Sequence, residues 1–271
     1  MQTLTTGKAD LIDSSSRQME THLPASDWTR REKVALTCRI LFEQGHDSGL
    51  AGQITARTET PGRYMTQQLG LGFDEITCRN LLVVDEDLNV MSGEGMANPA
   101  NRFHSWIYRA RPDVNCIVHT HPLHACALSL LERPLRVAHM DSCMLYDDVS
   151  FLARWPGVPV GNEEGELIAS VLAHRRAALL AHHGLVVAAR SVEEACVIAV
   201  QIERTARMQL LAEAAGEIRD IDPALAKEAH DWILQPTRSR ATFGYFARRA
   251  LRALSAGEAE ALLSFAAPPA G

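Results

Sequence analysis

The chain has 271 residues, of which 46% are hydrophobic and 22% are charged, and its formal net charge at pH 7 is −6. This composition is typical of a globular protein, and a chain of this length forms one large domain or two small ones. The acidic balance lacks the basic excess that accompanies binding to nucleic acid or to an anionic membrane, so we expect neither partner.

The first third of the chain predicts an arm, a helix and a hairpin. Residues 1–26 are polar and aperiodic, which favours a flexible N-terminal arm. Thr29 and Glu32 form a T-x-x-E capping-box pattern that predicts the start of a helix, and Gly45 can end it. Residues 52–66 alternate around a Pro-Gly pair, as the two strands of a hairpin do.

The middle third predicts further strands and two short helices. Residues 81–95 indicate two strands around a turn rich in Asp and Asn. Helical spacing of the apolar residues in 101–113 predicts a helix that Pro112 ends. Residues 115–122 predict a strand, and residues 124–132 predict a helix after it.

The last third begins with two apolar runs that are separated by residues 182–184. They predict two strands, or one strand bent at Gly184. Ser191 and Glu194 form a second capping-box pattern, which predicts the start of a long helix over residues 192–216.

Within this long helix, Glu203 and Arg207 are spaced to form an i,i+4 ion pair. The basic stretch 238–252 fits a subunit contact or a solvated face better than a ligand clamp. Mixed strands with covering helices and no linker predict one layered α/β domain. We place this domain at residues 27–220, followed by a C-terminal helical extension over residues 221–271.

The cysteines and the apolar runs indicate the cellular compartment in which the chain is expected. Six cysteines are scattered without a C-x-x-C pair, and the N-terminal residues lack the continuous apolar core of a signal peptide. The longest apolar runs are far shorter than a membrane span. We therefore expect a cytoplasmic protein without membrane partners.

The histidines carry the first indication of chemistry. His119 and His121 lie two residues apart in a predicted strand, so their side chains project to the same side. Two core or surface histidines would give the same pattern, but His182 and His183 follow another apolar strand. Adjacent strand residues face opposite ways, so only one of these two can join the pair. Three histidines from two strands leave open coordination positions, which is typical of a catalytic metal site for Zn, Mn, Fe or Co.

Longer motifs connect these histidines to a family. The stretch "PDVNCIVHTHPLHACALSLL" and the later "LLAHHGLVVAARSVEEACVIAVQIERTARMQ" resemble the class II aldolase/adducin family. The upstream "RFH" and a G-x-x-T-x-R pattern, Gly52 to Arg57, come in the family's order, and the resemblance covers about residues 30–215. It implies a single three-layer αβα domain with a central mixed or antiparallel sheet, and a homotetramer with active sites at subunit contacts. It places one divalent metal ion on His119, His121 and His183, the last because it directly precedes Gly184.

The sequence departs from the sugar-phosphate aldolases of this family at a Ser-Ser-Glu motif. The resemblance implies that the motif's glutamate is the proton-transferring base. Counting back from "RFH" places Asn98, Pro99 and Ala100 at the three positions, so this base is missing. Asn101 lies next to the position but takes up no proton at neutral pH.

The phosphate-binding positions of those aldolases are also changed. The resemblance places Gln53, Gly70 with Leu69, and Asn98 with Pro99 where the family has an Asn, a Thr-Gly pair and two serines. Most hydroxyl donors for a phosphate dianion are therefore missing. We expect a non-phosphorylated substrate that Gln53, Gly70 and Asn98 help to bind.

A third departure concerns the family's proton-donating tyrosine, which follows a histidine. The corresponding residues are His139 and Met140, and nearby Asp141 and Tyr146 could take over the role. We predict catalytic roles for His104, His139, Asp141 and Tyr146.

Arg57 is a predicted substrate-binding residue. Each of these candidates could instead have a purely structural role: a core histidine at position 104, a helix cap at His124, a turn residue at Asp141, packing by Tyr146 and a surface position for Arg57.

Together these features predict a metal-dependent lyase for a small-molecule carboxylate. A divalent metal can act as a Lewis acid that stabilises the enolate formed when a C–C bond breaks, in decarboxylation or in retro-aldol cleavage. Loss of the glutamate base damages an aldolase more than a decarboxylase, because decarboxylation needs no base to begin. The alternatives are a non-haem Fe(II) oxygenase that cleaves a hydroxyphenylpyruvate-type side chain, and a non-enzymatic adducin-like assembly domain.

Overall fold

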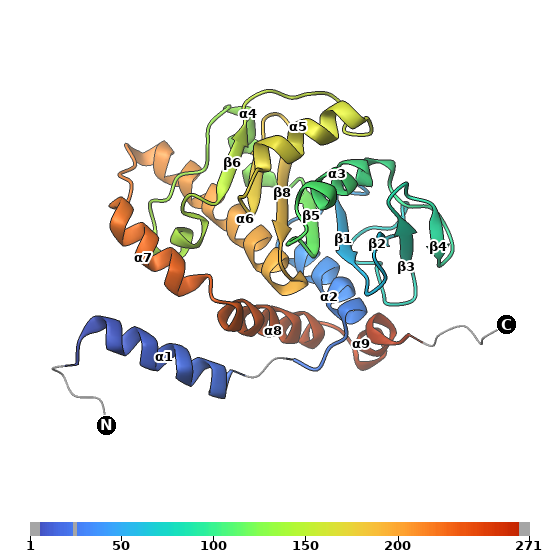
Figure 1. The fold of residues 1–271 in the computed structure, drawn as a ribbon, viewed down its shortest axis with the longest axis horizontal. Helices are drawn as coiled ribbons and strands as arrows, with labels where there is room; N and C mark the ends of the chain where they lie inside the picture. The colour runs from blue at the N-terminus through green and yellow to red at the C-terminus, as the bar shows by residue number, and fades with distance from the viewer. Residues whose placement is uncertain (1–5, 24–25, 266–271) are drawn as a thin grey trace.

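The computed structural model describes residues 6–23 and 26–265. In these ranges eight strands form one sheet in the spatial order β4-β3-β2-β1-β5-β8-β7-β6 (Figure 1). The strands are β1 (Gln53–Arg57), β2 (Arg63–Gln67), β3 (Leu81–Asp85), β4 (Val90–Ser92), β5 (Cys116–Thr120), β6 (Val149–Leu152), β7 (Ala177–Leu180) and β8 (Gly184–Ala189). Neighbours are antiparallel except β6 and β7, which are parallel, so the predicted mixed, largely antiparallel sheet is confirmed.

Helices cover both faces of this sheet (Figure 1). The described helices are α1 (Lys8–His22), α2 (Arg30–Glu43), α3 (Arg102–Ala110), α4 (Leu123–Leu130), α5 (Asn162–Leu172), α6 (Val192–Ala215), α7 (Pro223–Ile233), α8 (Pro236–Arg252) and α9 (Ala256–Leu263), with short 3-10 helices η1 (Pro99–Asn101) and η2 (Met140–Leu145). One core joins α2, α4, α6 and α8 to one face of the sheet, and a second core joins α3 and α5 to the other. The predicted three-layer αβα fold is therefore confirmed.

Local signals explain most element boundaries. The Thr29 side chain accepts a hydrogen bond from the Glu32 N–H, and the Glu32 carboxylate accepts from the Thr29 N–H, as the capping box predicts. Ser191 caps α6 through the Glu194 N–H, but the Glu194 carboxylate accepts from the N–H of Arg190 instead of closing a second box. The two apolar runs around residues 182–184 form separate strands.

The N-terminal segment contains a helix that the aperiodic sequence did not predict. None of the residues of α1 is buried. The Gln235 amide donates to the Ser16 hydroxyl at 3.2 Å, and Lys8 pairs with Glu228 at 2.5 Å, so α1 lies against the C-terminal helices. Residues 1–5, 24–25 and 266–271 of the predicted arm and extension lie outside the described residues. The division into arm, domain and extension stays a prediction.

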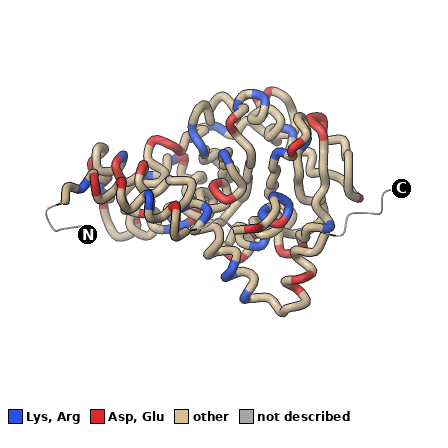
Figure 2. The backbone as a smooth tube through the Cα atoms, turned by 60° about the horizontal axis from the view of Figure 1, so that its bottom comes forward, with Lys and Arg blue, Asp and Glu red and all other residues tan. Residues whose placement is uncertain are grey.

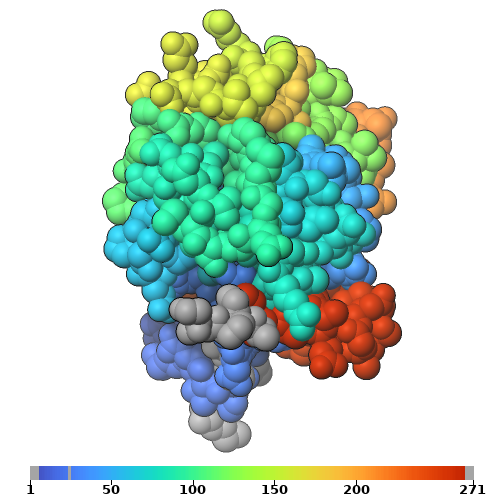
Figure 3. Space-filling model, turned by 90° about the vertical axis from the view of Figure 1, so that its right-hand side faces the viewer, coloured from blue at the N-terminus to red at the C-terminus, as the bar shows by residue number. Residues whose placement is uncertain are grey.

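Charged residues of both signs are spread along the chain. Lys and Arg are interspersed with Asp and Glu along the backbone (Figure 2). Seen from the side of β4, the chain around β3, β4 and α3 forms one continuous face, with α5 above it and α9 below (Figure 3). Across the described ranges, no helix combines the length and apolarity needed to cross a bilayer.

Strand register brings the site together at one end of the sheet. His119 lies opposite Gln53 on β1 and opposite Val186 on β8. Because directly opposite residues in an antiparallel pair project to the same face, Gln53 and His119 are neighbours on the α3 side of the sheet. The end of β5 and the start of β8 therefore determine where the predicted ligands can meet.

Candidate metal centre

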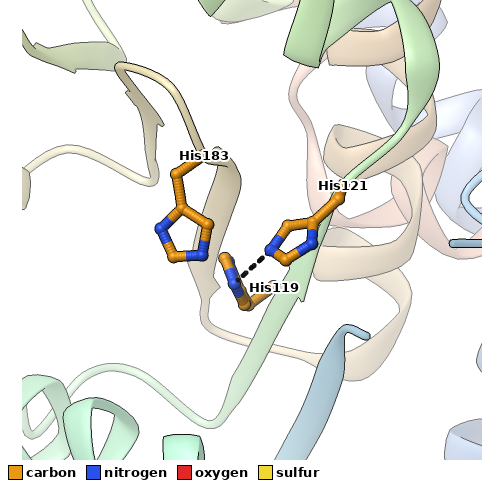
Figure 4. A group of neighbouring side chains, drawn as sticks. All are labelled: His119, His121 and His183. Atoms are coloured by element: carbon orange, nitrogen blue, oxygen red, sulfur yellow. Dashed lines mark hydrogen bonds between the residues drawn. The ribbon is translucent and has the colours of Figure 1, made fainter. Parts of the chain in front are cut away.

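Three histidine side chains converge at this end of the sheet, and they are the predicted ligands. His119 lies in β5, His121 follows the strand's end, and His183 lies in the turn before β8. Each can offer a ring nitrogen such that the three atoms lie within 4.8 Å of one another. The Nε2 atoms of His119 and His121 are 2.9 Å apart, and the three rings point toward one another (Figure 4).

The hydrogen bond of His119 determines which of its nitrogens can bind a metal. Its Nδ1 lies 2.8 Å from the carbonyl oxygen of Leu185. A carbonyl can only accept, so Nδ1 carries the proton and Nε2 presents its lone pair to the other two rings. A hydrogen bond from the second ring nitrogen to a backbone carbonyl is typical of histidines that bind metals. The donor set therefore fits a divalent ion.

Burial keeps the three imidazoles neutral. It lowers the pKa of His119 well below its ordinary value, and it also lowers the pKa of His121. Burial and the neighbouring His121 lower the pKa of His183 to about 4. A metal binds the unprotonated imidazole, so no proton has to be displaced from these ligands at neutral pH.

Close packing explains why a glycine follows the two histidines in the H-H-G sequence. A Cβ on Gly184 would lie 2.5 Å from the carbonyl oxygen of Thr120 and 2.6 Å from Cδ2 of His121, so only glycine allows β8 to start this close to β5. His182 has a φ of 57°, and its exposed ring lies 2.9 Å from the carboxylate of Glu132. Only one of the adjacent histidines joins the cluster, as expected, and it is His183, the one that the resemblance implies.

A buried polar network lies beside His119 on the α3 face. The Thr55 hydroxyl is 2.8 Å from Nδ1 of His104 and 3.0 Å from the Tyr108 hydroxyl. The Asn101 amide donates to the Thr66 hydroxyl at 3.0 Å. Thr55 and Thr66 are directly opposite each other on β1 and β2, which joins the two parts.

Three buried atoms around this network have no hydrogen-bond partner in the described part of the chain: Nε2 of His104, Oε1 of Gln53 and Oδ1 of Asn101. Buried polar groups are almost always paired, so each of these atoms has capacity for a water or a ligand. Burial lowers the pKa of His104 to about 3, so its ring is neutral.

The pairing of two loop segments places Gly70 and Asn98. Gln68 bridges antiparallel to Ala97, and the Leu69 N–H donates to the carbonyl of Met96. Gly70 therefore continues toward Gly95 while Asn98 lies toward Gln67, and the substrate-binding roles of both residues stay predictions. The Asn98 side chain accepts from the N–H of Ala100 and caps η1. The position of the missing glutamate thus lies at the start of α3, next to the buried network.

Arg57 and Tyr146 lie elsewhere in the chain. The Arg57 guanidinium donates to the carbonyls of Val114 and Tyr108 at 2.7 and 2.8 Å, at the end of β1 away from Gln53. Tyr146 precedes β6, whose start pairs with the start of β7, at the opposite end of the sheet from His183. The roles predicted for both residues stay predictions.

His139 and Asp141 lie at η2, along α6. The exposed His139 ring accepts from the N–H of Asp141 at 3.2 Å, so the two residues form a local turn. Asp141 lines a hollow together with Val200, Gln201 and Phe246. The placement of His139 and Asp141 does not decide whether they are catalytic, so these roles also stay predictions.

Glu203 has a different partner from the one that its spacing on the predicted helix indicated. Its carboxylate does not pair with Arg207; it accepts from Nδ1 of His124 at 2.5 Å and from the N–H groups of His124 and Ala125 at 3.1 and 2.9 Å. Pro122 cannot cap α4 with a side chain, so a carboxylate from α6 satisfies that helix start. Two features of the sequence could have indicated this contact. One is a charged residue in an otherwise apolar stretch of helix, and the other is a helix start after Pro122 that has no capping side chain.

The fold and the histidine cluster are those of class II aldolase-type proteins with a three-histidine metal site. A family model described as "Class II Aldolase and Adducin N-terminal domain" matches residues 32–210. The chain belongs to this family.

Several known proteins are similar to the chain. Decarboxylase NovR of Streptomyces niveus is 33% identical over 202 residues, which cover 73% of this chain and 74% of that protein. A protein of Streptomyces roseochromogenus subsp. oscitans described as 4-hydroxy-3-prenylphenylpyruvate oxygenase/4-hydroxy-3-prenylbenzoate synthase is 33% identical over 202 residues, covering 73% and 72%. The structure of L-fuculose 1-phosphate aldolase from Glaciozyma antarctica PI12 superposes with a TM-score of 0.79 at 26% identity, covering 89% of this chain and 97% of that one.

Proposed function

We propose that the chain is a divalent-metal-dependent lyase that cleaves a C–C bond of a non-phosphorylated hydroxy, keto or hydroxy-aromatic carboxylate, by decarboxylation or retro-aldol cleavage. The observation that carries this proposal is the convergence of three neutral imidazoles from β5 and the β7–β8 turn, with no carboxylate in their cluster among the described residues. When bound there, a Zn, Mn, Fe or Co ion would act as a Lewis acid on a substrate oxygen.

The chain's own residues contribute orientation and exclusion of water. The Leu185 carbonyl holds the His119 ring in one tautomer, and Phe103 packs edge-to-face against that ring with 5.1 Å between centroids. Oε1 of Gln53 can accept a hydrogen bond from a substrate hydroxyl on the α3 side, and Nε2 of His104 can accept or donate one, depending on its tautomer. Ala100 supplies no proton-transferring group, which favours a reaction that begins without a base.

The similarity to a protein described as a decarboxylase supports this reading. We further propose a cytoplasmic homotetramer in which a neighbouring subunit completes each site, and in which His139, Asp141 and Tyr146 could act across a subunit contact.

The test is an assay of the metal-loaded chain against hydroxy-aromatic and 2-keto-hydroxy acids, with Mn²⁺, Zn²⁺ or Co²⁺ added. We expect release of CO₂ or of a carbonyl fragment from at least one substrate class, and loss of turnover after chelation. Absence of turnover across the panel in a metal-loaded chain would contradict the proposal.

A second candidate is a non-haem Fe(II) oxygenase, which the equally similar oxygenase relative favours. Three histidines with open positions suit Fe(II) as well as Zn. Strict dependence on both iron and O₂ would decide for the oxygenase, and anaerobic turnover would eliminate it. A non-enzymatic adducin-like role is disfavoured by the intact cluster, and it would be revived by a purified chain with no affinity for divalent ions.

A further inference from the structure

A large hollow opens beside the histidine cluster on the side of α2, α4, α6 and α8. Its volume is about 980 Å³. The wall includes His121, the start of α4, and residues 43–48 after α2, so the hollow begins at one of the three histidines. A molecule held at the histidine cluster could extend into it.

Part of the lining comes from two helices that carry three arginines. Arg204 and Arg207 are three residues apart on α6, and Phe246 and Arg249 are three apart on α8, so each pair lies on one helix face. α8 lies outside the region that the family model matches, which ends at residue 210. The α8 part of this lining, with Phe246 and Arg249, therefore lies outside the matched region, whereas Arg204 and Arg207 lie inside it.

The three arginines are exposed, and none has an ion pair or hydrogen bond within the described ranges. The acidic residues of the hollow are mostly committed elsewhere. Glu43 pairs with Arg39 at 3.2 Å, and Glu203 binds His124 and the start of α4. Asp47 is the one acid of this lining for which the structure gives no partner. The free charge of the hollow is thus positive.

We propose that Arg204, Arg207 and Arg249 bind a substrate carboxylate remote from the histidine cluster, and that α8 thereby selects dicarboxylates or carboxylates with a second anionic group. A guanidinium matches the planar carboxylate with two parallel N–H donors, and Phe246 offers an apolar surface between the two ends of the molecule. This inference rests on the proposed lyase function, whose substrate class it narrows.

The test measures binding by calorimetry, with glutarate, its monomethyl ester and inorganic phosphate as probes, on the chain with and without Mn²⁺. We expect glutarate to bind the Mn²⁺-loaded chain more tightly than the monoester does, since only glutarate has a carboxylate for each end of the site, and Arg249→Gln or Arg207→Gln to weaken glutarate binding about tenfold. Because the arginines do not depend on the metal, their effect should persist without Mn²⁺. Arg248→Gln is the matched control, since Arg248 is an exposed neighbour on α8 that does not line the hollow.

The outcomes separate this inference from the proposed function. Equal glutarate binding by the wild type and the Arg249→Gln chain overturns the inference, as does tighter binding of phosphate than of glutarate. A changed oligomeric state of Arg249→Gln in sedimentation, with unchanged glutarate binding, also overturns it and assigns the arginines to a subunit contact. Arginine-dependent glutarate binding in a chain that turns over no panel substrate would instead contradict the lyase function and support the anion site.

Discussion

The two ends of the central sheet use their polar side chains in opposite ways. At the histidine end, three imidazoles meet with lowered pKa values and with buried atoms nearby that lack partners. At the other end, Arg176 pairs with Asp148 and, at 3.1 Å, with Glu194, and His230 lies 3.6 Å from Asp148. We call these four residues the Asp148 cluster; within the described residues, Nε2 of its His230 makes no hydrogen bond. The difference is therefore one of charge: opposite charges pair at one end, whereas neutral imidazoles gather beside unpartnered polar atoms at the other, as in a site that binds something.

The largest expected effect comes from removing one histidine of the three-histidine cluster. His183→Asn should lower the metal content from about one ion per chain to near zero and abolish turnover, because it removes one of three ligands. His182→Asn is the matched control: His182 is exposed and faces Glu132, and Asn tolerates its positive φ. Metal analysis by mass spectrometry checks both. Retention of metal by His183→Asn would contradict the assigned ligand set.

Removing the Asp148 carboxylate of the Asp148 cluster should lower the free energy of unfolding and leave the metal content unchanged. Asp148→Ala leaves Arg176 and His230 without their shared carboxylate and should cost about 2–4 kcal/mol of unfolding free energy. Urea unfolding at a fixed protein concentration measures this loss. Metal content per folded chain should be unchanged, and a fall in metal affinity would show that the two ends are coupled.

A change at Gly184 should affect both properties, because this residue is part of the backbone junction at the histidine end. Gly184→Ala places a Cβ against the Thr120 carbonyl and the His121 ring and should destabilise the chain by about 1–3 kcal/mol while weakening metal binding. Gly257→Ala in α9 is the control, since a Cβ there has nothing within 4 Å. Calorimetric unfolding and metal titration of the two variants provide the comparison. Unchanged metal affinity in Gly184→Ala would show that β8 can shift without moving the ligands.

The smallest effect concerns pH at the Asp148 cluster. Asp148, followed by Asp231, raises the pKa of His230 against the opposing effect of burial. A raised pKa in the folded chain means that the contribution of His230 is fully present below its unfolded pKa of about 6.5 and is lost as pH rises through the folded value. His230→Gln should therefore reduce stability at pH 6, by less than about 1 kcal/mol, and have less effect at pH 9. Unfolding curves at both pH values test this, and a larger effect at pH 9 would exclude the ion pair as the cause.

The same contrast explains what could be predicted from the sequence. Periodicity and turn signals predicted seven of the eight described strands, all except β6, and capping patterns and spacing predicted most helices, since those signals are local. Strand parity predicted that His119 and His121 project together. The resemblance to a family then supplied His183, and the structure brings all three rings together.

Contacts between distant segments could not be predicted in this way. Spacing on α6 suggested Arg207 as the partner of Glu203, but the start of α4 offers two N–H groups and an imidazole, which together outweigh one exposed ion pair. The positions of Arg57 and Tyr146 depend on which end of a strand they occupy. A single sequence does not give that relation until the strand order is known.

The register of β5 also has a consequence for how the chain folds. Gln53 lies opposite His119 on β1, and the carbonyl of Leu185 on β8 accepts the hydrogen bond of its ring; each of the two lies 66 residues from His119 in the sequence. Both pairings close long loops, which is slow and entropically costly. The three-histidine cluster therefore cannot exist before the central strands have docked, so metal capture would be a late event in folding. A metal bound so late would slow unfolding far more than it speeds folding. The rate at which a refolding chain takes up the metal would then report when the sheet is complete.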